Sequence, residues 1–170
     1  TEVAVTSGAK YAIFAALQVL CDPQDEVIVH SPYWVSYPAM AELADAKPVI
    51  AVCPKETGFK LSADILKRSL TAKTKVVILN SPNNPTGQVY SEQELKDLAS
   101  VLERTGAWVI SDDIYDRMIF TGQKIAPHIM QFSEKLRSQL ILVNSMSKTY
   151  SMTGWRIGSA VGDKKVIDAV

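Results

Sequence analysis

The stretch at residues 140–158 reads LILVNSMSKTYSMTGWRIG, and it indicates both a fold and a chemistry. It begins with four apolar residues, a length typical of a buried strand, and continues into a polar turn that carries Ser145, Ser147 and Lys148. Burial beside a strand disfavours the charged form of a lysine, because the ammonium group loses its water. Lysines in such places serve as nucleophiles that form Schiff bases with carbonyl compounds.

The residue types in this stretch also suit a phosphate group. Serine hydroxyls donate hydrogen bonds, and the planar guanidinium of Arg156, eight residues after Lys148, matches two phosphate oxygens at once. No carboxylate lies in the stretch to neutralise either cation. An aldehyde that also carries a phosphate uses all of these groups, and pyridoxal phosphate (PLP) is such a ligand. The alternative is a solvated turn with an ordinary surface arginine, which the residue types alone favour slightly.

The order of the residues is more specific than their types. The motif S-x-S-K at 145–148, followed by G-W-R-I-G at 154–158, closely resembles the PLP-lysine signature of class I aminotransferases. These enzymes form the aspartate aminotransferase-like branch of the fold-type I PLP enzymes. The resemblance covers essentially the whole chain. It implies that Lys148 forms the aldimine with PLP, and that Ser145 and Arg156 bind the phosphate.

Composition argues against several classes of protein. The chain has 170 residues, enough for one domain with a real core, and its 18 basic and 18 acidic residues give a net charge of zero without a run of like charge. Nothing indicates a nucleic-acid or membrane surface, and neither a membrane-spanning apolar run nor a signal peptide is present. Cys21 and Cys53 lack metal-site spacing, so we interpret them as reduced core thiols of a cytoplasmic protein.

Short apolar runs alternate with helical patterns, which indicates βαβ units and a largely parallel sheet. Strands are expected at residues 3–5, 27–30, 49–52, 76–79, 108–110, 140–143 and 157–161. Helices are expected at residues 9–20, 35–44, 62–70, 92–104 and 163–170. The resemblance implies a three-layer α/β fold in which one of seven strands is antiparallel. We assign that role to residues 157–161, because the segment before them is too short for a helical crossover.

In parallel sheets, ligands bind beyond the carboxyl ends of the strands, so the residues that follow each strand are the candidate site. After the first strand, Ser7-Gly8-Ala9 opens a helix whose backbone N–H groups and dipole favour an anion. An ordinary serine cap is the alternative. The motif resembles the family's phosphate-binding turn. Ala9 stands where the family often has a hydroxyl residue, which leaves the backbone amides as donors.

An aromatic and an amide side chain follow the second and fourth strands. Trp34 can stack on a flat ring or pack in the core, and the resemblance places it over the pyridine ring of PLP. Asn84 lies in a turn rich in Asn and Pro, which by itself indicates only rigidity. The family's Asn-Pro-x-Gly signature implies that Asn84 binds the ring hydroxyl oxygen and that the Asn84–Pro85 bond is cis.

Two adjacent carboxylates, Asp112 and Asp113, follow the fifth strand. Successive strand residues face opposite ways, so we do not expect the two to act as a pair. No cluster of His and Cys accompanies them, which argues against a metal site. The family pattern Asp-x-x-Tyr implies that Asp112 binds the pyridine nitrogen and that Tyr115 donates to the ring oxygen, with Asp113 as a bystander. We assign His30 and His128 to packing or to the surface.

The resemblance implies transamination, with Lys148, Asp112 and Tyr115 as catalytic residues that move an amino group from an amino acid to a 2-oxo acid. A β-lyase or a cyclopropane-forming synthase of the same fold, and an inactive truncated product, are the alternatives. We interpret residues 1–170 as part of the large, PLP-binding domain of a homodimeric enzyme, since the chain begins at Thr1 and ends in a helical pattern. The family's N-terminal arm and small C-terminal domain are not expected in it, so we expect this chain alone to have little activity.

Overall fold

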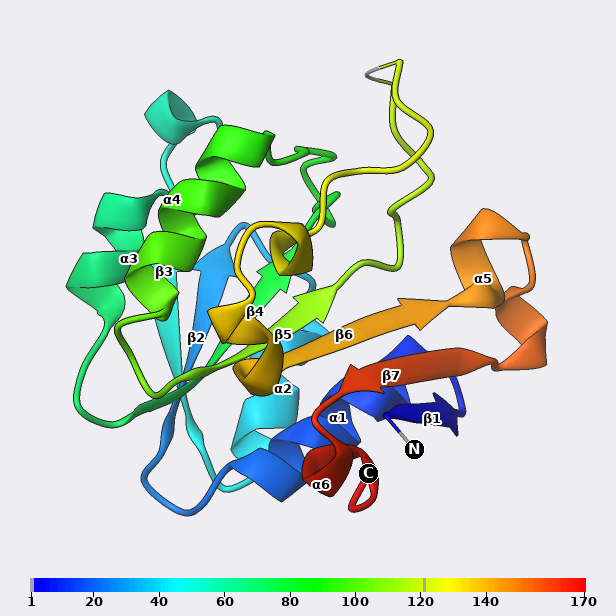
Figure 1. The fold of residues 1–170 in the computed structure, drawn as a ribbon, viewed down its shortest axis with the longest axis horizontal. Helices are drawn as coiled ribbons and strands as arrows, with labels where there is room; N and C mark the ends of the chain where they lie inside the picture. The colour runs from blue at the N-terminus through cyan, green and yellow to red at the C-terminus, as the bar shows by residue number, and fades with distance from the viewer. Residues whose placement is uncertain (1, 121) are drawn as a thin grey trace.

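One mixed sheet with helices on both faces forms the molecule, and the computed structural model describes residues 2–120 and 122–170 (Figure 1). The strands are β1 Val3–Thr6, β2 Glu26–Ser31, β3 Lys47–Val52, β4 Thr74–Asn80, β5 Trp108–Asp112, β6 Leu140–Ser145 and β7 Gly158–Gly162. Their order in the sheet is β1-β7-β6-β5-β4-β2-β3. The predicted α/β fold with a seven-stranded sheet is confirmed.

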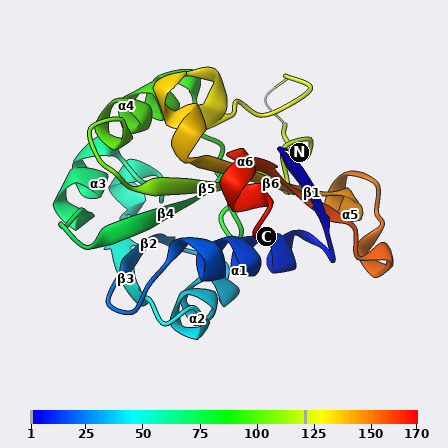
Figure 2. The same cartoon turned by 60° about the horizontal axis from the view of Figure 1, so that its bottom comes forward.

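Helices form the two outer layers (Figure 2). The α-helices are α1 Ala9–Leu20, α2 Ser36–Leu43, α3 Ala63–Ser69, α4 Glu92–Leu102, α5 Met146–Thr149 and α6 Lys164–Ile167. The 3-10 helices are η1 Lys55–Thr57, η2 Ile129–Gln131, η3 Lys135–Gln139 and η4 Thr153–Trp155. α1, α2 and α6 share a core cluster on one face of the sheet. α3, α4, η2 and η3 share a second cluster on the other face.

The central strands are continuous apolar runs because both of their faces are covered. In β4, Val76 and Ile78 belong to the cluster under α1 and α2, whereas Val77 and Leu79 belong to the cluster under α3 and α4. All four side chains are at most 2% exposed. This alternation is the period of two that a strand imposes, with an apolar residue required at every position.

β7 is the antiparallel strand, as predicted. It pairs antiparallel with both β1 and β6, while β2, β3, β4, β5 and β6 pair with one another in parallel. The segment between β6 and β7 contains only the short helices α5 and η4, which the sequence did not predict. A Cβ at Gly158, the first residue of β7, would overlap the backbone of Gly8 and Ala9. Glycine therefore lets the start of β7 pack against the turn before α1.

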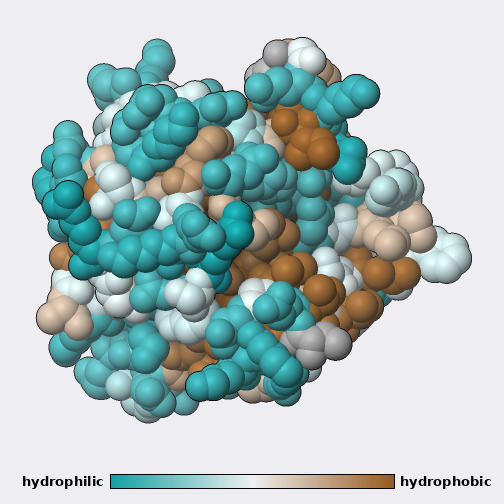
Figure 3. Space-filling model, in the orientation of Figure 1, coloured by the Kyte–Doolittle hydropathy of each residue, from teal (hydrophilic) through white to brown (hydrophobic). Residues whose placement is uncertain are grey.

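Most element ends differ from the predicted ends by one to three residues. The last strand begins at Gly158, one residue after the predicted start, and the helix expected at 92–104 ends at Leu102. The helical pattern at 163–170 forms only α6, which Asp163 caps by accepting a hydrogen bond from the backbone N of Lys165 at 2.9 Å. Figure 3 shows hydrophobic side chains gathered over β1 and β7, where Val5 is 79% exposed.

Candidate active site

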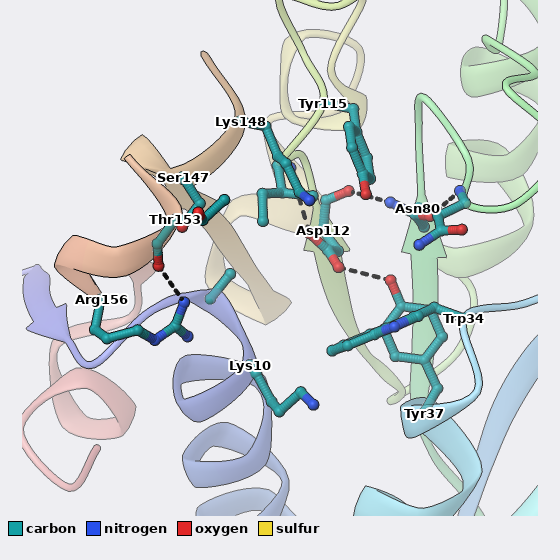
Figure 4. A pocket seen from close by; sticks show the side chains of 13 residues that line it. Lys10, Trp34, Tyr37, Asn80, Asp112, Tyr115, Ser147, Lys148, Thr153 and Arg156 are labelled. Carbon is teal, nitrogen blue, oxygen red and sulfur yellow. Dashed lines mark hydrogen bonds between the residues drawn. The ribbon is translucent and has the colours of Figure 1, made fainter. Parts of the chain in front are cut away.

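A cavity of about 480 Å³ opens where the carboxyl ends of the parallel strands meet (Figure 4). Of the residues that the sequence predicted for the site, those that line this cavity are Ala9, Trp34, Asn84, Asp112, Tyr115, Lys148 and Arg156. The other lining residues are Lys10, Tyr37, Asn80, Ile114, Thr153 and Ser147, the last of which belongs to the S-x-S-K motif. Segments from both halves of the chain therefore converge on one space.

Lys148 reaches the cavity from α5, the short helix that follows β6. Ser145 caps this helix, because its Oγ accepts a hydrogen bond from the backbone N of Ser147 at 3.0 Å. The same hydroxyl donates to the backbone O of Ile157 at 2.9 Å, which ties the helix to the return segment. Lys148 is half-buried, and its Nζ lies 5.6 Å from the centre of the Tyr115 ring. In the described part of the chain, no carboxylate forms a salt bridge with Lys148.

Three residues that the sequence predicted for the site, Ser7, Gly8 and Ser145, do not line the cavity. Ser7 is exposed, and Gly8 is the buried residue before α1. The hydroxyl of Ser145 contacts Oγ of Ser147 at 2.8 Å and the backbone O of Ile157 at 2.9 Å, whereas Ser147 itself lines the cavity. The contact of Ser145 with a phosphate stays a prediction.

Arg156 and the N-terminus of α1 form one end of the cavity. Arg156 has a left-handed backbone with φ of 52°, and its guanidinium donates to the backbone O of Thr153 at 3.1 Å and of Ser7 at 3.5 Å. Gly8 has a φ of 82°, and a Cβ there would overlap the guanidinium of Arg156. Within the described residues, no side chain caps α1 and no acidic residue lies in its first turn. This end of the cavity therefore offers positive charge and free N–H groups to an anion.

Asp112 is a buried carboxylate in the cavity wall, 4% exposed at the end of β5. The Tyr37 hydroxyl donates to its Oδ2 at 2.6 Å, and the backbone N of Ile114 donates to its Oδ1 at 3.3 Å. Burial raises the pKa of Asp112 to about 6, the two hydrogen bonds oppose the rise, and the charge of Asp113 adds to it. A cationic group beside Asp112 would favour its ionised form.

The loops after β4 and β5 are joined by Asn80, which is fully buried. Its Nδ2 donates to the backbone O of Asp112 at 2.8 Å, and its Oδ1 accepts from the backbone N of Asn84 at 2.8 Å. The cis peptide bonds of the described residues are Ser31–Pro32, Ser81–Pro82 and Asn84–Pro85. The prediction of a cis bond at Asn84–Pro85 is confirmed.

Trp34 forms the wall of the cavity next to α2. Its ring packs edge-on against the ring of Tyr37, with centroids 5.5 Å apart and planes at 87°. The Nζ of Lys10 also lies against Trp34, 4.7 Å from the centre of its ring. The sequence positions of Lys10 and Tyr37 are a signal that could have placed them at the site. Lys10 follows Ala9 in the first turn of α1, and Tyr37 comes one helical turn after Trp34.

Asp113 does not line the cavity and has partners of its own. It is 2% exposed, its Oδ1 accepts from the Ser111 hydroxyl at 3.0 Å, and its Oδ2 lies 3.0 Å from Nδ1 of His128. The hydrogen bond with Asp113 raises the pKa of His128, although partial burial acts against it. The family pattern implies a bystander at Asp113, and the sequence, which assigns His128 to packing or to the surface, does not predict this ion pair.

Comparison with known proteins gives a consistent result. The family model described as aminotransferase class I and II matches residues 1–170. An aspartate aminotransferase from Bacillus subtilis is 43% identical over 170 residues, which are 100% of this chain and 43% of that protein. An asparagine–oxo-acid transaminase from Streptococcus mutans is 40% identical over 169 residues, 99% of this chain and 43% of that protein.

Solved structures agree with the sequence relatives. The crystal structure of an aspartate aminotransferase from Rhizobium meliloti matches with a TM-score of 0.95 and 39% identity, over 99% of this chain and 42% of that one. An aspartate aminotransferase from Thermus thermophilus with maleate matches with a TM-score of 0.92 and 40% identity, over 99% of this chain and 43% of that one. The chain thus spans less than half the length of these relatives. None of the described helices has the length and apolar character needed to span a membrane.

Proposed function

Since the chain belongs to the class I and II aminotransferases, we propose that its protein moves an amino group from an amino acid to a 2-oxo acid with PLP as cofactor. The observation that carries the proposal is the single cavity that Lys148, Asp112 and Arg156 share (Figure 4). A nucleophilic lysine, a buried carboxylate and an anion-binding end are the groups that PLP chemistry uses. The transaminase names of the relatives support the same type of reaction.

The residues at the phosphate end fit this cofactor. The first N–H groups of α1 and the guanidinium of Arg156 would hold the phosphate, as an anion at a helix N-terminus requires. Glycine at position 8 leaves the room that Arg156 occupies, because a Cβ there would overlap the guanidinium. An arginine matches a phosphate better than a lysine would, since its planar fork donates two parallel hydrogen bonds.

The residues at the ring end fit as well. Trp34 would stack on the ring, Asn84 and Tyr115 would bind its hydroxyl oxygen, and Asp112 would pair with its protonated nitrogen. Asp112 suits this role because it is buried and, within the described residues, has hydrogen-bond donors but no salt bridge. When bound, the cofactor supplies an electron sink for the substrate's α-carbon.

Lys148 has two tasks in this proposal. Its Nζ would hold the cofactor, and its amine, when free, would move the proton at the substrate's α-carbon. Both tasks need an amine that reaches the cavity, and Lys148 lines it without a salt bridge to a carboxylate of the described residues. Asp112, as a buried carboxylate in the cavity wall, would keep the ring nitrogen of the cofactor protonated.

The substrate that we propose is an acidic amino acid such as aspartate. Lys10 lines the cavity beside Trp34, and no carboxylate of the described residues forms a salt bridge with it. Its ammonium group would bind the second carboxylate of such a substrate, and the names of several relatives agree. In the complete enzyme, Lys10→Ala should lower kcat/KM for aspartate roughly 10- to 100-fold, the effect of one hydrogen bond to a charged group, and change that for alanine much less. An equal loss for both substrates would contradict this assignment.

Chemical trapping tests the reaction type directly. The protein is loaded with PLP, reduced with borohydride and digested, and the labelled peptide is identified by mass spectrometry. We expect the label on Lys148, and its loss in Lys148→Ala, whereas a label on Lys10 would contradict the proposal. Product analysis with 2-oxoglutarate as acceptor then separates transamination from β-elimination and from cyclopropane formation, the alternatives on the same fold.

The homodimer and the cytoplasmic location stay predictions. Exposed hydrophobic side chains near β1 and β7 support an interface there, including Val5 at 79%, Tyr150 at 62% and Trp155 at 69% exposure. Exposed apolar surface is typical of contacts between proteins when it forms a patch. Sedimentation of the purified protein would give its mass, and a monomer at every concentration would contradict the dimer.

A further inference from the structure

Two carboxylates that are adjacent in sequence are buried together at the end of β5. Asp112 and Asp113 are 4% and 2% exposed. Asp112 lines the cavity, whereas Asp113 contacts Ser111 and His128, each at 3.0 Å. Burial of one carboxylate is unfavourable unless its charge is compensated, and two neighbours are harder to ionise together because like charges repel.

The two carboxylates differ in how the protein compensates them. Asp113 forms a salt bridge with His128, whose side chain is only 17% exposed. Asp112 receives hydrogen bonds from Tyr37 and from a backbone N–H, and within residues 2–120 and 122–170 no cation forms a salt bridge with it. The chain thus supplies a cation for Asp113 and leaves the place beside Asp112 to a cationic group of the ligand.

We propose that His128 is a positioning residue whose positive charge offsets that of Asp113, and so lets Asp112 stay ionised to hold the protonated ring nitrogen of PLP. The identity of this ligand rests on the proposed function, but the ion pair does not. The directions of the shifts agree with the geometry. Burial raises the pKa of Asp113 while His128 opposes the rise, and the hydrogen bond with Asp113 raises the pKa of His128.

Other charged groups act on the same carboxylates. Asp116 faces the ion pair, and its charge raises the pKa of both Asp113 and His128. Its Oδ2 accepts from Asn144 at 3.0 Å, while its buried Oδ1 has no hydrogen-bond partner among the described residues. Tyr37 and Asp113 act on the pKa of Asp112, and the other titratable groups that line the cavity with Asp112 are Lys10, Tyr115, Lys148 and Arg156. None of the lysines contacts Asp113 in the described structure, so the compensation there depends on His128.

Two substitutions should act on Asp112 in opposite directions. His128→Asn keeps an N–H donor near the place of Nδ1 but carries no charge, so Asp113 is left uncompensated and Asp112 takes up a proton at a higher pH. Asp113→Asn removes the like charge, so Asp112 stays ionised to a lower pH. A purely structural role of the ion pair would make both variants worse in the same direction.

The affinity for PLP, measured by absorbance titration between pH 5 and 9, is the first readout. We expect PLP affinity to fall at acidic pH, and we call this fall the acidic limb. Its midpoint should lie about one pH unit higher in His128→Asn and about one pH unit lower in Asp113→Asn than in the wild type. Gln131→Ala is the matched control, because it removes the hydrogen bond that Gln131 accepts from the backbone N of His128 at 3.0 Å without a change of charge. This control should leave the limb in place.

NMR titration of His128 in the protein without PLP is the second readout. We expect its pKa to lie above the ordinary histidine value and to fall toward that value in Asp113→Asn. An unchanged His128 titration in Asp113→Asn, or limbs that move the same way in both variants, would overturn the inference. A wild-type protein that does not bind PLP would contradict the proposed function, and in that case the NMR result still shows whether the ion pair exists.

Discussion

At the scale of single residues, Tyr37 favours the ionised form of Asp112, the buried carboxylate of the cavity. Its hydroxyl donates to Oδ2 of Asp112 at 2.6 Å, and the tyrosine is 2% exposed. Burial and the neighbouring charge of Asp112 raise the pKa of Tyr37 well above its ordinary value. Tyr37 therefore stays protonated and remains a donor. A donated hydrogen bond favours the ionised form of the carboxylate that accepts it.

Replacement of Tyr37 by phenylalanine should make Asp112 harder to ionise. The carboxylate would lose a hydrogen bond to a charged group, worth about 1.5–3 kcal/mol, so its pKa should rise above about 6 by ~1–2 units. Since Asp112 is the proposed partner of the ring nitrogen, PLP affinity should weaken below neutral pH. The measurement is the pH dependence of the PLP dissociation constant.

Tyr33→Phe provides the matched control for this prediction. Tyr33 is a half-buried tyrosine in the loop before α2, the helix that carries Tyr37, and no hydrogen bond joins Tyr33 to Asp112 in the described structure. It should leave the pH dependence unchanged. Equal shifts in both variants would mean that the whole segment that includes Tyr33 and the start of α2, and not the Tyr37 hydroxyl, sets the ionisation of Asp112.

Residue identities in motifs could be predicted from the sequence, but their partners could not. Asp112 and Lys148 were found because each follows an apolar run in a recognisable order of residues. Tyr37 and Asp112 are 75 positions apart, and nothing in either local sequence indicates that their side chains meet. The contact depends on the packing of α2 against the sheet, which is a tertiary effect.

At the scale of elements, the turn before α1 and the start of β7 act as one unit. Gly158 packs so closely against Gly8 and Ala9 that a Cβ would overlap their backbone. Arg156, two residues earlier, donates to the backbone O of Ser7 at 3.5 Å. The segment that carries the lysine loop back into the sheet therefore also shapes the anion-binding end of the cavity.

Gly158→Ala should disturb that end of the cavity. The atoms that the new methyl group would meet belong to the backbone, so they cannot rotate away as a side chain would. We expect the free energy of unfolding to fall by about 1–3 kcal/mol and PLP affinity to fall at least ~10-fold. Urea unfolding and PLP titration measure the two effects.

Gly154→Ala is the matched control from the same segment, since nothing lies within 4 Å of a Cβ built there. It should leave PLP affinity within about twofold, because a methyl group in open space loses no contact. If the two glycine variants lost affinity equally, close packing at Gly158 would not be the reason for the loss.

The long helices could be predicted from the sequence, whereas the single-turn helices between β6 and β7 could not. The predicted helix at 9–20 has the same bounds as α1, because its apolar periodicity extends over three turns. α5 is a single turn, held by the Ser145 cap and by the bond of the same hydroxyl to the backbone O of Ile157. Such turns are set by individual hydrogen bonds, which leave no periodic pattern in the sequence.

At the scale of the whole molecule, two buried groups respond to acid in opposite ways. His30 lies in β2, is 3% exposed, and its Nδ1 has no hydrogen-bond partner among the described residues. Burial lowers the pKa of His30 to about 4 and raises the pKa of Asp112 to about 6. Between pH 6 and 4, protonation of the unfolded chain at His30 destabilises the fold, while proton uptake by Asp112 in the folded state stabilises it. The two contributions partly cancel.

His30→Phe should remove the contribution of His30 to the pH dependence of the free energy of unfolding. In the wild type, the contribution of His30 to stability is complete above its unfolded pKa of 6.5 and is lost as the pH falls toward about 4. For one group that binds a proton in the unfolded chain but not in the folded protein, the loss of unfolding free energy amounts to ~2 kcal/mol between pH 7 and pH 5. We therefore expect the free energy of unfolding of the variant, relative to the wild type, to rise by that amount over the interval. Urea unfolding at the two pH values measures it.

The other histidine provides a control of opposite sign. The folded-state pKa of His128 is raised, so its contribution is complete at low pH and is lost as the pH rises through that value. His128→Asn should therefore lose stability relative to the wild type on the acidic side, where His30→Phe gains it. If the difference between His30→Phe and the wild type were the same at pH 7 and pH 5, His30 would titrate in the folded protein as it does in the unfolded chain. The acid response of the molecule would then have to come from its carboxylates and from His128.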